Sequence, residues 1–193
     1  MKFLRINAEQ PGKKLLLEAA GYIKQGKLII YPTDTVYGLG CRIDLAESVD
    51  RIYELKERSI NAPLSVAFSD LDMLERYVIL SDKEREFIVE NAVEPFTFVV
   101  KKRGNISDLV TAGGETVGAR IMNHPVSREI IRYANMPIIT TSANISGDEA
   151  PKDVGEINYK IKAGVDLIID SGPCKLGVPS KVIEIKTGKL LRG

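Results

Sequence analysis

The alternation of short β-branched runs with longer amphipathic segments constrains the fold of this sequence more than any other feature. Runs rich in Ile and Val are typical of buried strands, and they occupy 27–31, 64–68, 96–101, 117–121, 137–141, 166–169, 181–185 and 189–192. Apolar residues recur at helical spacing over 11–25, 45–58, 125–134 and 154–162. This order predicts an α/β fold with a largely parallel or mixed sheet and helices on its faces.

Certain residues are expected to bound the helices. Pro11 suits the first turn of the first helix, and Gly26 suits the position just past its end. Three pairs have the spacing of a capping box and are expected to begin further helices: Asp44 with Glu47, Ser69 with Asp72, and Ser81 with Glu84.

The length and the charge balance exclude several classes of protein. A chain of 193 residues buries roughly 70% of its unfolded surface, so it needs no disulfide or metal to hold a core. Lys and Arg total 27 and Asp and Glu total 26, a net charge of +1, whereas proteins that coat nucleic acids are usually strongly basic. We expect a single domain over 1–193.

The cysteines and the lengths of the apolar stretches indicate the cellular compartment of the protein. Cys41 and Cys174 are too far apart in sequence to suggest a metal motif or a disulfide framework, which fits a reducing compartment. The first ten residues lack the apolar run of a signal peptide, and no stretch reaches the roughly 18 apolar residues of a membrane span. The sequence therefore predicts a cytoplasmic protein without a membrane segment.

Common catalytic signatures are absent. The sequence has no phosphate loop of the G-x-x-x-x-G-K-[ST] type, no G-x-G-x-x-G turn, no G-x-S-x-G elbow, no H-E-x-x-H and no C-x-x-C. The single histidine, His124, cannot build a metal cluster. Any chemistry must therefore come from less common motifs.

Two polar loops directly follow predicted strands. Residues 32–40 (PTDTVYGLG) combine hydroxyls, a carboxylate and two glycines, and residues 140–147 (TTSANISG) are dense in hydroxyl and amide groups. Ligands of open α/β sheets bind beyond the strand ends, so both loops are candidate binding loops. For the first loop, an ordinary turn whose hydroxyls bond their own backbone is an equal alternative. Residues 177–180 on their own indicate only a turn.

Three cations each have two interpretations. Lys56 and Arg58 lie at a predicted helix end, where the helix dipole alone favours cations, and their spacing alone favours that explanation. The alternative is an anion site in which both side chains neutralise phosphates. Arg120 interrupts a neutral strand, so it lies at an exposed edge or points into a site.

Taken together, these segments resemble the motifs of one family, the YrdC-like threonylcarbamoyl-AMP synthases. PTDTVYGLG at 32–40 is similar to its first motif, and TSANISG, with Ser142 and Asn144, to its third. The second is matched by Lys56, Arg58, Pro63 and Leu64. The resemblance runs from about residue 26 to residue 193. It implies a twisted, YrdC/RibB-like α/β fold with a concave ligand-binding surface, in the short stand-alone form.

The resemblance also implies a reaction: L-threonine, bicarbonate and ATP give L-threonylcarbamoyladenylate and pyrophosphate. Mg²⁺ is expected on the ATP phosphates, since it prefers substrate phosphates to protein cages. A separate threonylcarbamoyltransferase complex then passes the group to a tRNA adenosine, and this chain is expected to contact RNA weakly at most.

Site residues follow from the same resemblance. It implies catalytic roles for Lys56 and Arg58. The threonine ligands are implied to be Thr35, Arg120, Thr140 and Ser180. The nucleotide ligands are implied to be Lys56, Arg58, Thr116, Ser142, Asn144 and Arg192.

This sequence departs from the family pattern at several positions. Polar residues that the family often carries are replaced by Ala62, Ala67 and Ala150, and Lys181 follows Ser180 where a threonine is common. The usual Pro-Gly-Pro-x-Thr reads Val-Glu-Pro-Phe-Thr at 93–97, and Met122 stands where Arg-x-Pro has its proline. These changes leave room for a paralogue with weakened or altered activity.

Two other functions stay open. The basic run 101–103 could serve a double-stranded RNA or tRNA-binding module without catalysis, although such runs are commonly solvated loops. A relative that uses carbamoyl phosphate instead of threonine is the other alternative. Thr35, Arg120 and Ser180 argue for an amino-acid ligand.

Overall fold

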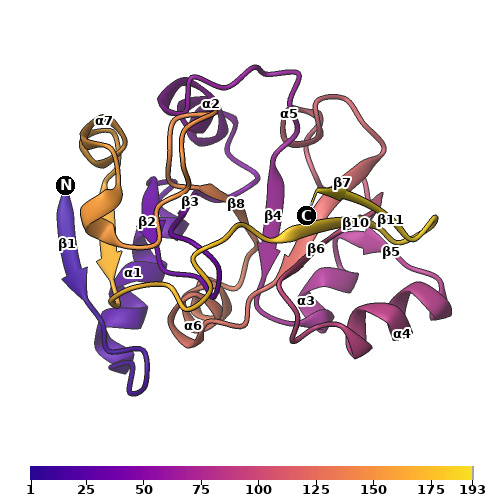
Figure 1. Cartoon of the computed structure of the whole chain (residues 1–193), viewed down its shortest axis with the longest axis horizontal. Helices are drawn as coiled ribbons and strands as arrows, with labels where there is room; N and C mark the ends of the chain where they lie inside the picture. The colour runs from indigo at the N-terminus through magenta and orange to yellow at the C-terminus, as the bar shows by residue number, and fades with distance from the viewer. Residues whose placement is uncertain (193) are drawn as a thin grey trace.

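The computed structural model describes residues 1–192, and Gly193 lies outside the described part of the chain (Figure 1). An eleven-stranded sheet has the order β1-β9-β2-β3-β8-β4-β7-β6-β10-β11, and β5 pairs with β6 off this path. The strands are β1 (Lys2–Arg5), β2 (Ile29–Tyr31), β3 (Gly38–Gly40), β4 (Ser65–Phe68), β5 (Val78–Ile79), β6 (Phe96–Lys102), β7 (Thr116–Ile121), β8 (Ile138–Ser142), β9 (Leu167–Asp170), β10 (Lys181–Glu184) and β11 (Lys189–Arg192).

The sheet is mixed, as predicted. Strand β9 runs parallel to β1 and β2, β4 parallel to β7, and β6 parallel to β10. Antiparallel pairs β2/β3, β3/β8 and β8/β4 connect these parallel groups. Because only β3 separates β2 from β8, the polar loop after β2 comes close to the polar end of β8.

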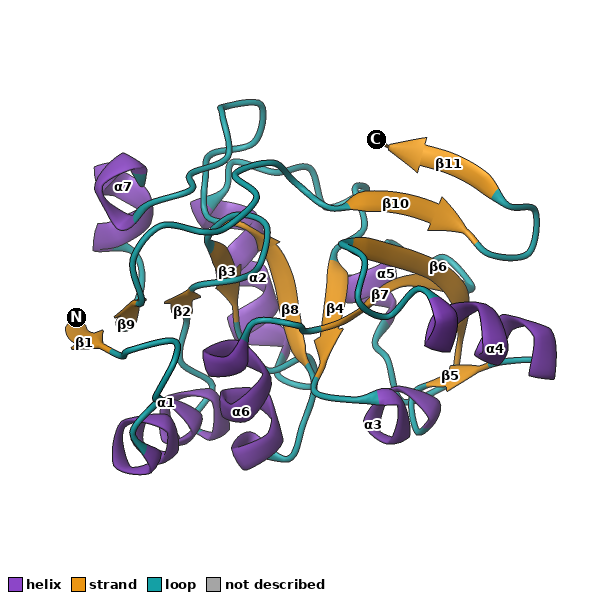
Figure 2. Ribbon diagram, turned by 60° about the horizontal axis from the view of Figure 1, so that its bottom comes forward, coloured by secondary structure: helices purple, strands orange, loops and turns teal. Residues whose placement is uncertain are grey.

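Helices cover both faces of the sheet (Figure 2). On one side α1 packs against α6, while α3 and α6 contact β4; on the other side α5 contacts α2 and β7. The helices are α1 (Lys13–Lys24), α2 (Ala46–Leu55), α3 (Leu71–Glu75), α4 (Asp82–Glu90), α5 (Asp108–Thr111), α6 (Pro125–Ala134) and α7 (Tyr159–Ala163), with a 3₁₀ turn, η1 (Val154–Glu156).

Helix α1 shows how the apolar pattern becomes packing. Its apolar face is buried at Leu16, Ala19, Ala20 and Ile23, and Leu15 on the same predicted face is partly buried. Gly26 has φ +74°, a left-handed conformation that glycine adopts without steric cost, and it lies just past the helix end as predicted. Burial of this stripe fixes the helix on the sheet.

Several of the residues predicted to begin helices do not do so. Helix α1 begins at Lys13 with Gly12 as its N-cap, so Pro11 precedes the helix. The N-cap of α2 is Leu45, whose apolar side chain cannot cap, and the carboxylate of Asp44 pairs with Arg42 at 2.6 Å instead of capping the helix. The capping box of Ser81 and Glu84 at α4 is confirmed.

Asp70, and not Ser69, caps α3, because its Oδ1 accepts from the Met73 backbone N–H at 2.7 Å. The predicted helix over 154–162 is also wrong as one element. It divides into η1 and α7, since the side chain of Asn158 caps a new helix.

Short strands were not predicted where their sequences lack an apolar run. Strand β3 reads Gly-Leu-Gly, and β1 buries only one of its four residues. Neither has the periodicity on which strand prediction depends. Both form because neighbouring strands offer them backbone hydrogen bonds.

Candidate functional site

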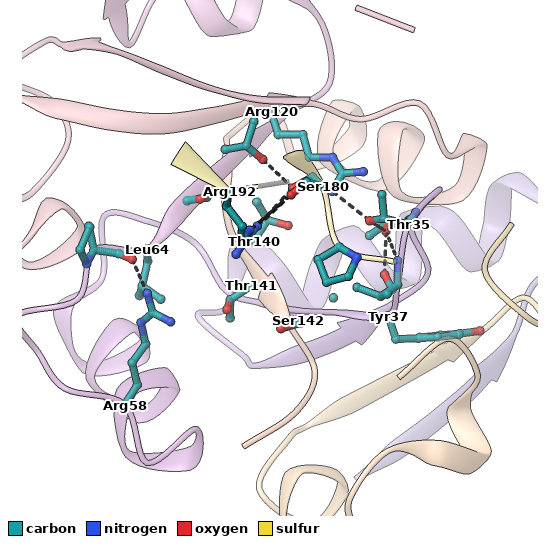
Figure 3. Close-up of a pocket in the computed structure, with 17 residues that line it drawn as sticks. Thr35, Tyr37, Arg58, Leu64, Arg120, Thr140, Thr141, Ser142, Ser180 and Arg192 are labelled. Carbon is teal, nitrogen blue, oxygen red and sulfur yellow. Dashed lines mark hydrogen bonds between the residues drawn. The ribbon is translucent and has the colours of Figure 1, made fainter. Parts of the chain in front are cut away.

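A polar pocket opens where the loop after β2, the end of β8 and strands β4, β6, β7 and β11 converge (Figure 3). Its volume is about 130 Å³, below the roughly 300–1,000 Å³ of pockets that enclose drug-sized ligands. The enclosed part therefore suits a small polar molecule, and a larger ligand must extend beyond it. The pocket is lined by Thr33, Thr35, Val36, Tyr37, Gly38, Arg58, Pro63, Leu64, Ser65, Thr97, Arg120, Thr140, Thr141, Ser142, Pro179, Ser180 and Arg192.

Three guanidinium groups give this pocket a positively charged lining. Arg58, Arg120 and Arg192 line it, and within residues 1–192 its lining contains no acidic side chain. Burial, together with the nearby Arg58 and Arg120 cations, lowers the pKa of Arg192. An anionic ligand would relieve this mutual repulsion.

Arg120 points into the site and is not at an exposed edge. Its guanidinium Nη2 lies 2.6 Å from Asp34 Oδ1, and Nη1 donates to Thr35 Oγ1 at 3.0 Å. The two ion-pair side chains are only 7% and 17% exposed. Arg120 is therefore held in one position while it retains other N–H donors for a ligand.

Arg58 and Arg192 are held through backbone carbonyls. Arg58 donates from Nη2 to the Pro63 carbonyl at 2.8 Å, and Arg192 donates from Nη2 to the Ser180 carbonyl at 3.1 Å. Ser180 Oγ also lies 2.9 Å from Thr97 Oγ1, and both hydroxyls are buried. Cations and hydroxyls thus share one wall of the pocket.

Lys56 lies behind the pocket and is absent from its lining, so the structure does not bring it to the cavity beside Arg58. Its ammonium Nζ donates to the carbonyls of Ser142 and Asn144 at 2.5 and 2.7 Å, and to Asn144 Oδ1 at 3.2 Å. Only 2% of Lys56 is exposed, and burial, with a smaller effect of Arg58, lowers its pKa to about 7. The hydrogen bonds of Lys56 therefore hold the 142–144 loop against the end of α2.

Asn144 is also turned away from the cavity. Its Oδ1 accepts from Ser142 Oγ at 2.6 Å, and its Nδ2 donates to the Asp148 carbonyl at 2.7 Å. The amide therefore shapes the loop that presents Ser142 to the pocket.

Thr116 does not reach the pocket. It is exposed at the start of β7, four residues before Arg120, and the rise of a strand separates the two by roughly 13 Å. The other implied ligands, Thr35, Thr140, Ser142 and Ser180, do line the cavity.

The structure adds residues that sequence patterns did not single out. Ser65 and Thr97 both line the pocket, although one lies in a predicted strand and the other in the altered segment 93–97. The sequence signal that could have identified them is the alternation of polar and buried residues along their strands, because residues two apart on a strand share a face. Which face meets the cavity depends on the tertiary structure.

The basic run 101–103 does not form a free patch. Lys102 pairs with Asp108 at 2.5 Å, and Arg103 Nε donates to the carbonyl of Val78 at 2.9 Å. Two of the three cations are thus committed to this chain, which weakens the case for a phosphate-binding surface there.

Comparison with known proteins decides the family. The sequence model of the Sua5/YciO/YrdC family, described as "Telomere recombination", matches residues 21–193. The chain belongs to this family. A protein of Methanocaldococcus jannaschii is 35% identical over 191 residues, which cover 99% of this chain and 89% of that protein. One from Psychromonas ingrahamii, named threonylcarbamoyl-AMP synthase, is 32% identical over 182 residues, 92% and 95% of the two chains.

Solved structures agree with the fold. Sua5 of P. abyssi, complexed with L-threonine, superposes with a TM-score of 0.89 at 31% identity, over 95% of this chain and 54% of that one. YciO of E. coli gives a TM-score of 0.90 at 26% identity, over 100% and 95%. The predicted YrdC-like α/β architecture is confirmed.

Two further observations concern metals and membranes. Within residues 1–192 no group of three or more His, Cys, Asp or Glu side chains could hold a metal ion. None of the helices in the described residues is long and apolar enough to span a membrane.

Proposed function

We propose that this chain is a threonylcarbamoyl-AMP synthase, a nucleotidyltransferase that converts L-threonine, bicarbonate and ATP into L-threonylcarbamoyladenylate and pyrophosphate. The observation that carries the proposal is the pocket that Arg58, Arg120 and Arg192 line together with several threonine and serine residues. The name of the Psychromonas relative and the threonine in P. abyssi Sua5 support it.

The buried end of the pocket suits threonine. Arg120 is fixed by Asp34 and Thr35, and its free N–H donors can form a fork with a carboxylate. Thr140 and Ser180 supply further hydroxyls at this end. A charged carboxylate and several hydrogen-bonding groups match the polar lining, and the volume of about 130 Å³ suits a ligand of amino-acid size.

The reaction needs positioning more than covalent catalysis. The threonine amine condenses with bicarbonate to a carbamate and releases water. A carbamate oxygen then attacks the α-phosphorus of ATP, the bond from that phosphorus to the bridging oxygen breaks, and pyrophosphate leaves with the bond electrons. The protein's role in this scheme is to hold the reactants in line and to offset the negative charge.

Arg58 and Arg192 are the cations proposed to bind the phosphates. They lie on the pocket wall with Ser142, and each guanidinium is already oriented by a backbone carbonyl. Preorganised cations of this kind stabilise charge as it develops on phosphate oxygens. Lys56 and Asn144 contribute by holding the loop that carries Ser142.

Mg²⁺ enters this proposal with ATP and has no protein site of its own. The pocket lining offers hydroxyls and guanidinium groups and, in the described residues, no carboxylate. Mg²⁺ takes oxygen ligands and retains water readily, so the triphosphate is its natural partner. The metal is therefore treated as part of the substrate.

The product is an activated acyl-adenylate, so an acceptor must consume it. We propose that a separate threonylcarbamoyltransferase complex passes the group to tRNA. A cytoplasmic location belongs to the same proposal, supported by Cys41 and Cys174, which are both free and buried.

Pyrophosphate release tests the function. The protein is incubated with Mg²⁺, ATP, bicarbonate and labelled threonine, and release is measured with and without threonine. We expect release that depends on threonine and yields a labelled adenylate. No release, combined with tight salt-sensitive RNA binding, would support an RNA-binding module instead. Release with carbamoyl phosphate but not with threonine would indicate the carbamoyl-phosphate alternative.

A further inference from the structure

The hydroxyl of Tyr31 is a polar group that this fold leaves without a hydrogen bond. Tyr31 is the last residue of β2, and it is 1% exposed. Within residues 1–192 its Oη atom is buried and has no hydrogen-bond partner. Most buried hydroxyls are paired, so an unpaired one close to a binding pocket needs an explanation.

The register of the sheet places the Tyr31 side chain on the face that carries the pocket. Tyr31 is paired with Gly38 of β3, and Gly38 is paired with Ser142 of β8. Residues that are directly opposite each other share a face of the sheet, and so do residues two apart on one strand. Thr140 therefore lies on the same face. Gly38, Thr140 and Ser142 line the pocket, and Tyr31 lies behind them.

Two glycines allow the ring of Tyr31 to cross β3. A Cβ at Gly38 would lie 2.9 Å from Tyr31 Cζ, and a Cβ at Gly40 would lie 3.0 Å from Tyr31 Cε1. The end of the ring therefore lies over β3, in the space that side chains at these two positions would fill. From there the hydroxyl points from β2 toward β8, the strand that contains Thr140.

The electrostatic surroundings of the phenol agree with this placement. Burial raises the pKa of Tyr31, and the Thr140 hydroxyl and the Arg120 cation act against that rise. Thr140 and Arg120 both line the end of the pocket proposed for threonine. A threonine hydroxyl can donate one hydrogen bond and accept two, so Thr140 is able to bond to Tyr31 and to a ligand at the same time.

We propose that Tyr31 is a positioning residue whose hydroxyl bonds to that of Thr140 when threonine occupies the pocket, and so holds Thr140 toward the substrate. The proposal rests on the proposed function, because it takes threonine as the ligand. A hydrogen bond that forms only with the ligand in place adds to the affinity for that ligand. It adds nothing to the stability of the free protein, and this difference makes the proposal testable.

Kinetics of Tyr31→Phe, which removes the hydroxyl and keeps the ring, gives the first test. We expect the KM for threonine to rise about fivefold, the effect of one ordinary hydrogen bond. The KM for ATP and kcat should equal those of wild type, because only the binding of threonine is weakened. An unchanged KM for threonine, or an equal rise in the KM for ATP, overturns the proposal.

Urea denaturation without ligand distinguishes this role from a structural one. Tyr37→Phe is the comparison, because the Tyr37 hydroxyl donates to the Gly172 carbonyl at 2.8 Å and accepts from the Ser171 N–H at 3.2 Å. We expect the denaturation midpoint to fall in Tyr37→Phe and not in Tyr31→Phe, since only the first variant loses hydrogen bonds of the free protein. An equal fall in both variants would make the Tyr31 hydroxyl structural and overturn the proposal.

A double variant tests whether Tyr31 acts through Thr140. Thr140→Val removes the hydroxyl that Tyr31 is proposed to hold, so adding Tyr31→Phe to it should raise the KM for threonine no further. A further rise as large as that of Tyr31→Phe alone would show that the two hydroxyls act independently, and would overturn the proposal. Tyr159→Phe is the matched control, because Tyr159 is 75% exposed in α7, and its kinetic constants should equal those of wild type.

Ultraviolet difference spectra provide a readout that needs neither ATP nor turnover. The sequence contains seven tyrosines and no tryptophan, so the near-ultraviolet absorption reports mainly on phenols. A phenol that gains a hydrogen bond changes its absorption, so adding threonine to wild type should give a difference band that Tyr31→Phe lacks. The same band in both proteins overturns the proposal. If wild type shows the band and Tyr31→Phe does not, absence of pyrophosphate release would count against the proposed function alone.

Discussion

Replacement of Arg58 by alanine separates its catalytic role from its structural one. Arg58 follows the end of α2, lines the pocket and bonds only to backbone carbonyls: Nε to Ala62 at 3.2 Å and Nη2 to Pro63 at 2.8 Å. The substitution removes one of three cations and leaves the rest of the lining unchanged. We expect a large kinetic effect and a small effect on stability.

The stability change follows from these contacts. Each hydrogen bond contributes about 0.5–1.5 kcal/mol net, and water can replace the guanidinium at the Pro63 carbonyl, where the bond is exposed. Removal of a cation also relieves Arg192 and Lys56, whose pKa values are lowered first by burial and then by Arg58. The free energy of unfolding should therefore change by no more than about 1 kcal/mol. Urea denaturation measures it.

The kinetic change is expected to be far larger. Loss of one preorganised donor to charge that develops on a reacting group costs about 100- to 1,000-fold in kcat. Pyrophosphate release under saturating threonine and ATP measures this loss. Arg132→Ala is the control, since Arg132 is an exposed arginine paired with Glu129. A kcat of Arg58→Ala within threefold of wild type, or unfolding of the variant, would refute the catalytic role.

An independent readout comes from Lys56. If Arg58 contributes to the low pKa of the Lys56 ammonium, the pKa should rise above its value of about 7 in Arg58→Ala. NMR titration of the Lys56 side chain measures this shift. No change would show that burial alone sets the value.

Three further changes test the packing around the site. Asp34→Asn leaves the buried Arg120 cation without its charged partner. The free energy of unfolding, measured by urea denaturation, should therefore fall by about 3 kcal/mol. A loss below about 0.5 kcal/mol would show that water replaces the lost carboxylate. The pKa of Lys56 is about 7 in the folded protein and about 10.4 in the unfolded chain. Between these two pH values the unfolded chain binds more protons than the folded protein. The free energy of unfolding should therefore rise with pH over this range, by up to about 1.4 kcal/mol per pH unit. That slope should vanish in Lys56→Met; an unchanged slope would assign it to another group. Gly40→Ala would drive a Cβ into the carbonyl of Ile139, so its Tm should fall by about 5 °C or more, whereas Gly104→Ala, with open space around it, should match wild type.

The segments with strong periodicity were predicted correctly because their signal is local. Helix α6 and strands β6 and β9 depend on apolar residues at helical or strand spacing, and each forms close to the predicted bounds. Helix starts were less predictable, because Asp44 has two partners within reach and the competition favours Arg42 over the helix N-terminus.

The candidate site was predicted in composition but only partly in arrangement. Thr35, Arg58, Arg120 and Ser142 meet in one pocket as expected. Lys56 belongs to the same motif as Arg58 and lies two residues away, yet it faces the 142–144 loop instead of the cavity. Spacing at a helix end does not specify which side chain turns inward, because Glu57 between them adopts a positive φ of 50° and redirects the chain.

The sequence alone determined the alternation of helices and strands, the polar loops that follow two strands, and the motifs by which the family was identified. These features depend on residues close together in the chain, where periodicity and spacing are visible. Only the tertiary structure decided that β3 is placed between β2 and β8, and that three arginines far apart in sequence face one cavity. Both depend on backbone pairing and packing between segments far apart in the chain, which no spacing in a sequence specifies.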